Sequence, residues 1–229
     1  MTQRMTNPYR DSAGKSLEDY PRPSVAVDTA VLTVPDSGRL SVLLTRTNDA
    51  IADDGAQWRL PGTFLHDGER LAEAVLRSLR EKAGVEGLRP RQLRVFDEPE
   101  RDDRGWVLSV AHLDVVAANR IRLVERTRIV PVDELPALQF DHEEIVAAAT
   151  ATLRAEYRAA PDPWALLGTE PFTVRDLRLL HEAIAGKRFN PDTFRRTMLP
   201  GLVATGELRT GARGKPAELY LRVNPVPAG

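Results

Sequence analysis

The stretch from Pro61 to Val85, PGTFLHDGERLAEAVLRSLREKAGV, constrains the fold of this 229-residue chain more than any other. Its apolar residues recur three and four positions apart, and they are Leu71, Ala74, Val75 and Leu79. This spacing predicts an amphipathic helix over residues 71–82 that buries one face and that Gly84 closes. Positions 78, 81 and 82 are then neighbours on the helix surface, because residues three and four apart share a face.

The same stretch resembles the Nudix box, G-x5-E-x7-R-E-U-x-E-E-x-G-U, in which U is a bulky aliphatic residue. The matching positions are Glu69, Arg77, Leu79, Glu81, Gly84 and Val85. Thr63 replaces the first glycine of the pattern, and Ser78 and Lys82 replace two of its clustered glutamates. Mg²⁺ requires hard oxygen ligands in near-octahedral geometry, which a hydroxyl, one carboxylate and an ammonium do not supply. We therefore expect no bound metal, no catalytic residue and no efficient hydrolysis, with weak residual activity left open.

Composition and charge exclude several classes of protein. The chain has no cysteine, which excludes disulfides, thiol nucleophiles and zinc fingers and fits a cytoplasmic location. No apolar run approaches the roughly 18 residues of a membrane span, so we expect a soluble protein without a membrane partner. Residues 168–229 carry ten Lys and Arg against six Asp and Glu, a net charge of +4, whereas the rest carries 22 against 27, or -5. This basic third is a candidate polyanion site, with an ordinary solvated surface as the alternative.

The first part of the chain alternates strand and helix patterns. Residues 1–22 have the composition of a disordered polar tail. Residues 25–34 and 40–45 are rich in Val, Leu and Thr and flank a Pro-Asp-Ser-Gly turn, which predicts a β-hairpin. The further predictions are a loop at 48–57, strands at 58–60, 93–96, 106–116 and 129–132, and a helix at 140–158. This interleaving places residues 23–160 in the α/β class, and the Nudix resemblance implies an α/β/α sandwich with a mixed sheet.

Residues 161–229 form a separate predicted domain. Pro161 and Pro163 break the preceding helix and mark a linker. Thr173, with Asp176 three residues later, is a capping-box start for a first helix, which Gly186 ends.

A second helix starts at Asn190, the N-cap, with Pro191 at the first helical position. It is expected to bury Phe194, Met198 and Leu202. A hairpin with a basic, glycine-rich tip at 211–216 follows, and in its second strand Leu219, Leu221 and Val223 point one way. Helix, turn, basic helix and basic hairpin indicate a winged helix-turn-helix. The candidate DNA contacts are Lys187, Arg188, Asn190, Thr193, Arg195, Arg196, Thr197, Arg213 and Lys215, the last two on the wing.

Two further segments narrow the resemblance. Arg104 to Val110, RGWVLSV, and Phe140-Asp141-His142 are similar to segments of Nudix-related transcriptional regulators, bacterial proteins that join a Nudix-like domain to a winged helix-turn-helix. This resemblance covers about residues 24–225. It implies a homodimeric repressor of NAD biosynthesis and metabolism genes, which binds a palindromic operator and senses ADP-ribose without a required cofactor.

The resemblance also implies a site for a diphosphate-linked ligand. Its candidate contacts in this chain are Arg46, Arg59, Phe64, Glu69, Glu81 and Lys82. Phe64 as a core residue is an equally good interpretation. A further hypothesis is that Lys82 supplies the positive charge that a metal otherwise brings to the diphosphate. His142 follows an aspartate at a helix start, which favours a capping or interface role over catalysis.

Two other functions remain open on the sequence. The first is an active Nudix hydrolase of ADP-ribose or a related diphosphate, which would use Glu81 with Glu69 or with carboxylates outside the box. The second is a ligand-sensing adaptor whose C-terminal module binds protein instead of DNA. Magnesium-dependent release of AMP would favour the hydrolase, and a steep loss of nucleic-acid affinity with added salt would favour DNA contact.

Overall fold

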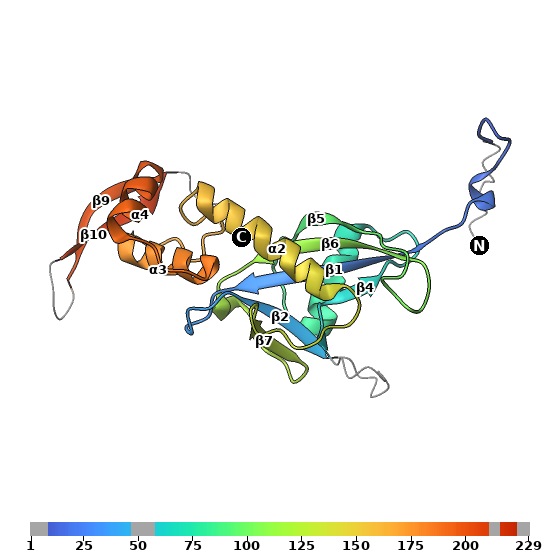
Figure 1. Cartoon of the computed structure of the whole chain (residues 1–229), viewed down its shortest axis with the longest axis horizontal. Coiled ribbons are helices and arrows are strands. Elements are labelled where there is room, and N and C mark those ends of the chain that lie inside the picture. The colour runs from blue at the N-terminus through green and yellow to red at the C-terminus, as the bar shows by residue number, and fades with distance from the viewer. Residues whose placement is uncertain (1–8, 47–57, 211–215, 224–229) are drawn as a thin grey trace.

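Two lobes joined by a long helix make up the computed structural model of the chain (Figure 1). The structure describes residues 9–46, 58–210 and 216–223. The first lobe contains a seven-stranded sheet, and the second contains a three-stranded sheet with helices packed against it. Helix α2 (His142–Ala159) lies across one face of the large sheet and continues to the second lobe.

The centre of the large sheet is the parallel pair of β1 (Ser24–Thr33) and β6 (Val107–Val115). Both strands are almost entirely buried, which fits their apolar and β-branched composition. The strand order is β3-β2-β1-β6-β5, with β4 also paired to β1 and β7 also paired to β2, and these other pairs are antiparallel. The remaining strands are β2 (Ser41–Arg46), β3 (Trp58–Arg59), β4 (Gly62–Phe64), β5 (Arg91–Phe96) and β7 (Thr127–Pro131). The predicted hairpin of β1 and β2 is confirmed.

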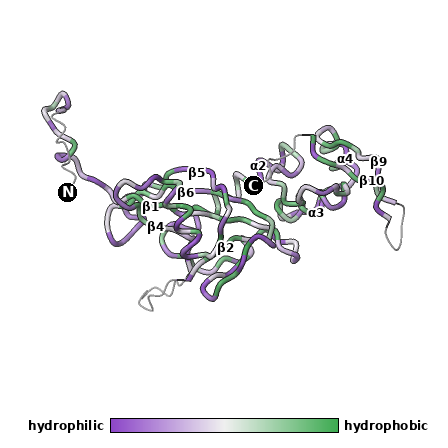
Figure 2. Tube along the Cα trace, turned by 180° about the vertical axis from the view of Figure 1, so that it is seen from behind, coloured by the Kyte–Doolittle hydropathy of each residue, from purple (hydrophilic) through white to green (hydrophobic). Residues whose placement is uncertain are grey.

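Alternation along β1 divides the core of the first lobe into two layers. Val27 and Val31 pack toward α1 (Leu71–Ser78), whereas Ala30 and Leu32 pack toward α2. Each Val or Leu buried in this way contributes roughly 1.5–3 kcal/mol relative to an exposed side chain. Apolar segments follow the strands inside both lobes in Figure 2, and the hydrophilic segments gather at the turns and the N-terminal extension. The predicted α/β/α sandwich with a mixed sheet is confirmed.

The helix of the Nudix-like box differs from the prediction in its last turn. After Ser78 the chain forms a π-helical turn, η2 (Leu79–Ala83), and ends at Gly84 with φ 65°. Ser78 is buried at 1% exposure, whereas the Glu81 side chain is 52% exposed. Positions 78, 81 and 82 therefore lie at different depths, because the wider turn changes the angular spacing that an α-helix would have.

The second lobe confirms the local signals read from its sequence. It consists of β8 (Phe172–Thr173), α3 (Val174–Ala185), α4 (Pro191–Met198), η4 (Leu199–Gly201), β9 (Leu202–Arg209) and β10 (Ala217–Arg222). Thr173 Oγ1 accepts from the Asp176 N–H at 3.1 Å, and Asn190 Oδ1 accepts from the Thr193 N–H at 3.0 Å. Gly186, at φ 68°, ends α3. The winged helix-turn-helix fold follows from this order of elements and from the sheet order β8-β10-β9.

The core of the second lobe contains the residues predicted for it. Phe194, Met198 and Leu202 are buried as predicted. In β10 Tyr220 is buried, whereas Leu221 is 37% exposed and Val223, just after the strand, is 49% exposed. The apolar alternation of this strand therefore marks its outer face, because the helices pack against the opposite face.

The predicted linker is a packed joint. The helix ends at Ala159, as the prolines imply, but Asp162 is fully buried. Its carboxylate accepts from the Tyr157 hydroxyl at 2.6 Å and from the N–H groups of Leu166 and Leu167, and it forms an ion pair with Arg222. The two lobes are thus tied together where composition alone indicates a loose connection.

Some predictions concern residues that the structure does not describe, or the N-terminal extension. The loop at 48–57 and the wing residues Arg213 and Lys215 lie outside the described residues, as do residues 1–8 of the tail. Residues 9–22 extend away from the first lobe (Figure 1), include η1 (Leu17–Asp19), and hydrogen-bond among themselves. A further short element, η3 (Ala118–Arg120), follows β6.

Candidate ligand site and nucleic-acid interface

Glu69 and Arg77 form the scaffold of the box. The Arg77 guanidinium donates to both carboxylate oxygens of Glu69 at 2.8 Å and to the carbonyl oxygen of Phe64 at 3.0 Å. These bonds, followed by the bond from the His66 N–H, lower the pKa of Glu69 to about 2. Arg77 therefore fixes the β4-to-α1 loop on the helix, and both oxygens of Glu69 are occupied in doing so.

Lys82 lies where the Nudix pattern has a carboxylate. Its half-buried ammonium donates to the carbonyl oxygen of Gly62 in β4. Burial, and then the charge of Arg59, lower the pKa of Lys82. The sequence-predicted residues Lys82, Arg59 and Glu81 are thus brought to one region beside the box helix, with Glu81 3.9 Å from Arg77.

The donor set beside the box helix does not fit Mg²⁺. Among the described residues the buried Ser78 hydroxyl has no hydrogen-bond partner, and Glu81 is the carboxylate that remains of the pattern's clustered three. Across the described ranges no three His, Asp or Glu side chains come together in a metal-ligating group. A cation already occupies this region, so an added divalent ion would meet the repulsion of Lys82.

An aromatic and cationic cluster borders the box. The Arg104 guanidinium carbon lies 5.3 Å from the Phe64 ring centroid and 4.9 Å from that of Phe140, and Asp102 holds Arg104 through two bonds of 2.8 and 2.7 Å. Phe64 is 39% exposed, so the interpretation of this residue as core is wrong. The exposed Phe64 ring beside a fixed cation suits the stacking of a planar base. Arg104 was missed as a site residue, although it begins the RGWVLSV segment.

A buried polar network lies directly beneath β4. Asp28 of β1 accepts from the Ser109 hydroxyl at 2.6 Å and lies 3.3 Å from Nε2 of His142 and 3.8 Å from Arg101. Burial acts to raise the pKa of Asp28, but His142, Ser109 and Arg101 together outweigh it and hold the pKa below its ordinary value. His142 is 2% exposed, and its capping or interface role stays a prediction; Asp28 was not singled out from the sequence, because it lies inside an apolar strand.

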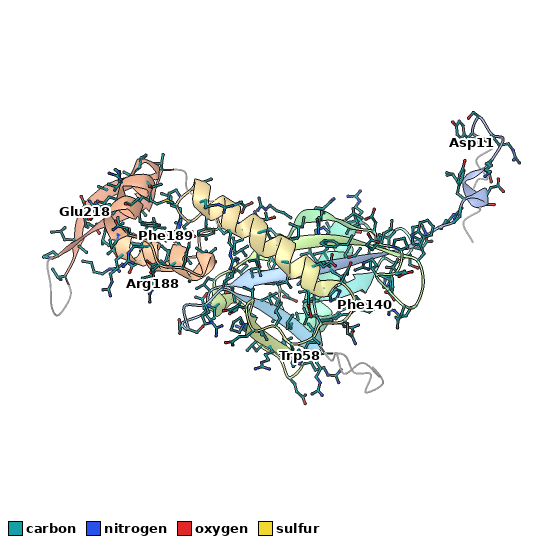
Figure 3. The ribbon with its side chains drawn as sticks, viewed as in Figure 1. Asp11, Trp58, Phe140, Arg188, Phe189 and Glu218 are labelled. Carbon is teal, nitrogen blue, oxygen red and sulfur yellow. The ribbon has the colours of Figure 1, made fainter. Side chains whose placement is uncertain are left out.

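Arg46 and Arg59 lie on adjacent strands at the edge of the sheet. Arg46 of β2 pairs with Trp58 of β3, next to the pair of Thr45 and Arg59. Figure 3 shows Trp58 and Phe140 on the same side of the first lobe. The charge of Arg59 acts on Lys82, which places Arg59 beside the box helix, whereas Arg46 is exposed at the end of the neighbouring strand β2.

The outer surface of α4 is basic and hydroxyl-bearing. Thr193, Arg196 and Thr197 are exposed, as predicted. Arg195 is also exposed, and it donates to the Tyr220 hydroxyl at 3.0 Å and lies 3.9 Å from Glu218 of β10. This contact orients Arg195 over the wing strands.

The turn before α4 is held by its own contacts. Glu182 of α3 accepts from Arg188 at 2.9 Å and from the Phe189 N–H at 2.9 Å, and the Arg188 side chain remains 84% exposed. Lys187 lies 5.8 Å from the Phe189 ring centroid. Asn190 uses its Oδ1 as the N-cap. Figure 3 labels Arg188, Phe189 and Glu218 in this second lobe. The predicted contacts that the structure describes thus share one lobe, on and immediately before α4.

Comparison with known proteins decides the family. The NUDIX domain model matches residues 24–150, and the model of the NrtR DNA-binding winged helix domain matches residues 164–221. The crystal structure of Shewanella oneidensis NrtR complexed with a 27mer DNA is 31% identical, has a TM-score of 0.69, and covers 86% of this chain and 93% of its own. The chain belongs to the NrtR family of Nudix-related regulators.

Relatives of this NrtR family member include regulators and an enzyme. The ADPR responsive transcriptional repressor NtrR of Acinetobacter baylyi is 29% identical over 88% of this chain and 83% of its own length. The NUDIX domain of S. oneidensis NrtR complexed with ADP ribose is 30% identical, with a TM-score of 0.51, over 62% of this chain and 95% of its own. The ADP-ribose pyrophosphatase of Methanocaldococcus jannaschii is 31% identical over 58% of this chain and 76% of its own.

The two NrtR-type domain matches leave residues 151–163 between them. This segment contains the second half of α2 and the buried Asp162 joint, so in this NrtR family member the connection between the two matched regions is packed. No helix in the described part of this NrtR family member is long and apolar enough to cross a membrane.

Proposed function

We propose that this protein is a DNA-binding repressor of genes of NAD biosynthesis and metabolism, and that ADP-ribose is its effector. The observation that carries the proposal is the combination in one chain of an exposed basic α4 and a Nudix site whose metal face contains Lys82. A site that binds a diphosphate without cleaving it is what a sensor requires. The named relatives from A. baylyi and S. oneidensis support the same assignment.

The DNA interface of the proposal is α4 with the wing. Thr193, Arg196 and Thr197 enter the major groove, while Arg195, Lys187 and Arg188 neutralise phosphates. Two copies related by a two-fold axis bind a palindromic operator whose half-sites lie one or two helical turns apart. Such a repressor acts where the chromosome lies, which is the cytoplasm in a bacterium.

The ligand interface of the proposal surrounds the box helix. The Lys82 ammonium, supported by Arg59, receives the diphosphate, and Phe64 with Arg104 receives the adenine face. No cofactor is needed, because the protein itself supplies the positive charge. ADP-ribose then shifts the dimer to an arrangement whose recognition helices no longer match the operator. The shift cannot exceed the difference in ligand affinity between the two states, typically about 1–3 kcal/mol.

The deciding experiment is a titration of labelled upstream DNA of the protein's own gene, with and without ADP-ribose. We expect the wild type to bind this DNA with steep salt dependence and to release it when ADP-ribose is added. The double variant Arg195→Ala and Arg196→Ala should lose operator binding while it keeps ligand affinity. A matched double variant at the exposed Arg122 and Arg128 of the first lobe should behave as the wild type. Wild-type operator affinity in the Arg195→Ala and Arg196→Ala variant would contradict the assignment of α4 as the DNA-recognition helix.

The role of Lys82 has its own test. A charged contact to the diphosphate contributes about 1.5–3 kcal/mol, so Lys82→Ala should weaken ADP-ribose binding by roughly 10- to 100-fold in calorimetry. Arg80, which is exposed on the same helical turn, provides the control Arg80→Ala. Unchanged affinity in Lys82→Ala would contradict the hypothesis.

The second candidate function is hydrolysis of ADP-ribose. It is favoured by the similarity to the M. jannaschii pyrophosphatase and by the intact Glu69–Arg77 pair. An assay of Mg²⁺-dependent AMP release from ADP-ribose distinguishes the two. We expect no turnover above that of a Glu81→Gln control, since the residues beside the box helix do not fit the metal.

A further inference from the structure

The first turn of α2 is fastened to the segment that leads into the box. The Gln139 N–H donates to the carbonyl oxygen of Trp58 at 3.0 Å, and the Leu60 N–H donates to Nδ1 of His142 at 3.0 Å. Because Nδ1 accepts, the ring proton lies on Nε2, which faces Asp28 at 3.3 Å. A single buried imidazole thus joins α2 to both β1 and the 58–64 segment.

The same segment contains candidate ligand contacts and cannot move independently of Asp28. Gly62 lies so close to Asp28 that a Cβ built on it would be 1.8 Å from Oδ1. Arg101, whose side chain is 2% exposed, bonds to Asp141 just before α2 through two of its guanidinium nitrogens and also faces Asp28. A displacement of Gly62 or Lys82 by a bound diphosphate is therefore passed to the beginning of α2.

The other end of α2 is fastened to the DNA-binding lobe. The Tyr157 ring packs edge-on against His181 of α3 with 5.0 Å between centroids, and His181 packs in the same way against Phe194 of α4, also at 5.0 Å. Leu153 of α2 and Ile184 of α3 belong to one buried cluster. A helix of 18 residues is about 27 Å long, so a small tilt at its start becomes a larger displacement of α4.

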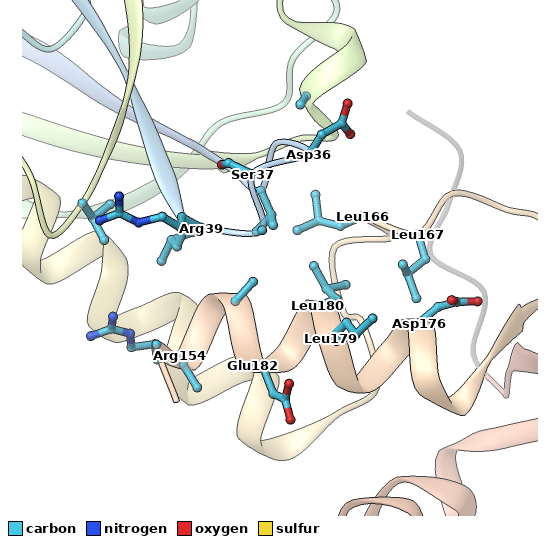
Figure 4. A pocket seen from close by; sticks show the side chains of 18 of the residues that line it. Asp36, Ser37, Arg39, Arg154, Leu166, Leu167, Asp176, Leu179, Leu180 and Glu182 are labelled. Carbon is cyan, nitrogen blue, oxygen red and sulfur yellow. The ribbon is translucent and has the colours of Figure 1, made fainter. Parts of the chain in front are cut away.

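Space for that movement exists on the opposite side of α3. A crevice of about 1050 Å³ separates α3 from the turn between β1 and β2. In Figure 4, Asp36 and Ser37 of this turn face Leu179 and Leu180 of α3 across the opening. α3 therefore packs on α2 with one face and borders open space with the other.

We propose that His142 is a positioning residue that couples the ligand site to the DNA-binding lobe, with the Leu60-to-His142 bond as the connection and α2 as the moving element. This inference rests on the proposed function, since it concerns the response of operator binding to ADP-ribose. It requires that α2 and the second lobe move as one body, with the hinge at the beginning of α2. The coupling is a ratio of two operator affinities, measured with and without ADP-ribose.

Two isosteric variants separate the two contacts of the ring. The amide oxygen of Asn reaches the place of Nδ1, so His142→Asn keeps the Leu60 bond. The amide of Gln reaches the place of Nε2, so His142→Gln keeps only the Asp28 contact. Fluorescence anisotropy with labelled operator gives the affinity ratio, calorimetry gives ADP-ribose affinity, and thermal unfolding gives stability. A role confined to stability lowers the melting temperature in both variants and leaves the ratio alone.

The wild-type ratio is expected to lie between about 5 and 150. His142→Asn should keep it within about threefold, whereas His142→Gln should bring it close to 1, with operator affinity in the absence of ligand unchanged. If the ratio falls close to 1 in both variants, His142 is still the positioning residue, and its contact with Asp28 is then needed for the coupling as well as its bond to Leu60. Wild-type ratios in both variants, or retention by Gln alone, would overturn the proposal. His112→Gln, at another buried histidine, is the control and should keep the ratio.

Hydrogen exchange of the wild-type chain covers the case in which His142→Gln does not fold. ADP-ribose should change the exchange of the Leu60 amide and of the first turn of α2 in concert. Unchanged exchange in α2 while DNA is released overturns the proposal. If the wild type itself ignores ADP-ribose, the proposed function fails; if it responds and the variants respond equally, only the His142 inference fails.

Discussion

His181 makes the stability of the second lobe sensitive to acid. Its side chain is 3% exposed between Tyr157 and Phe194, and its Nε2 has no hydrogen-bond partner among the described residues. Burial lowers the pKa of His181 to about 4, against the smaller opposite effect of Asp162. In the unfolded chain the pKa of His181 is near 6.5, so between about pH 6.5 and pH 4 the unfolded state binds a proton that the folded state does not bind. The free energy of unfolding therefore falls as the pH drops from about 6.5 toward 4.

The magnitude follows from the two pKa values. Linkage gives a loss of about 2 kcal/mol between pH 8 and pH 5, and about 3 kcal/mol once the pH reaches 4. His181→Phe keeps an aromatic ring between Tyr157 and Phe194 and removes the titrating group. The free energy of unfolding of the variant minus that of the wild type should rise by about 2 kcal/mol from pH 8 to pH 5.

Urea unfolding monitored by tryptophan fluorescence, to which Trp164 beside the joint contributes with Trp58 and Trp106, measures this difference at each pH. Carboxylates such as Glu69 titrate in both proteins, so their contribution cancels in the subtraction. A pH-independent difference for His181→Phe would refute the reasoning, because it would mean that the folded state accepts the proton as readily as the unfolded chain.

Three substitutions test the packing that positions the sites. Arg222→Ala leaves the buried Asp162 carboxylate without its cation and should lower the free energy of unfolding by about 3–5 kcal/mol in urea; a loss below about 1 kcal/mol would contradict the joint. Gly62→Ala forces β4 away from Asp28, so it should lower the free energy of unfolding by about 1–3 kcal/mol and weaken ADP-ribose binding; unchanged ADP-ribose affinity would contradict the close packing of Gly62 on Asp28. Phe194→Ala should destabilise the second lobe by about 3–5 kcal/mol, and an unchanged melting temperature would argue against the core that supports α4.

The amino-acid sequence by itself determined the features that depend on neighbouring residues. The capping pairs at Thr173 and Asn190 and the terminating Gly186 are decided within four residues of the chain, so a short stretch of sequence is enough to identify each of them. The register of the box likewise identified Glu69 and Arg77, which lie eight residues apart on a loop and the helix that follows it and form an ion pair in the structure. The two-domain class followed from the order of these local signals.

Only the tertiary structure decided which polar residues meet. In the sequence Asp28 is a single charged residue within an apolar strand. Its role follows from contacts with Ser109, which lies 81 residues later in the chain, and with His142 of α2. In β10 the core contains Tyr220 and not the neighbouring Leu221. Successive side chains of a strand point to opposite faces, and only the tertiary packing decides which face is buried. Asp162 turned a segment with the composition of a linker into a joint, because a buried carboxylate persists only where distant donors such as Arg222 satisfy it. Periodicity shows which face is apolar, but the partner of a buried charge is a property of the whole fold.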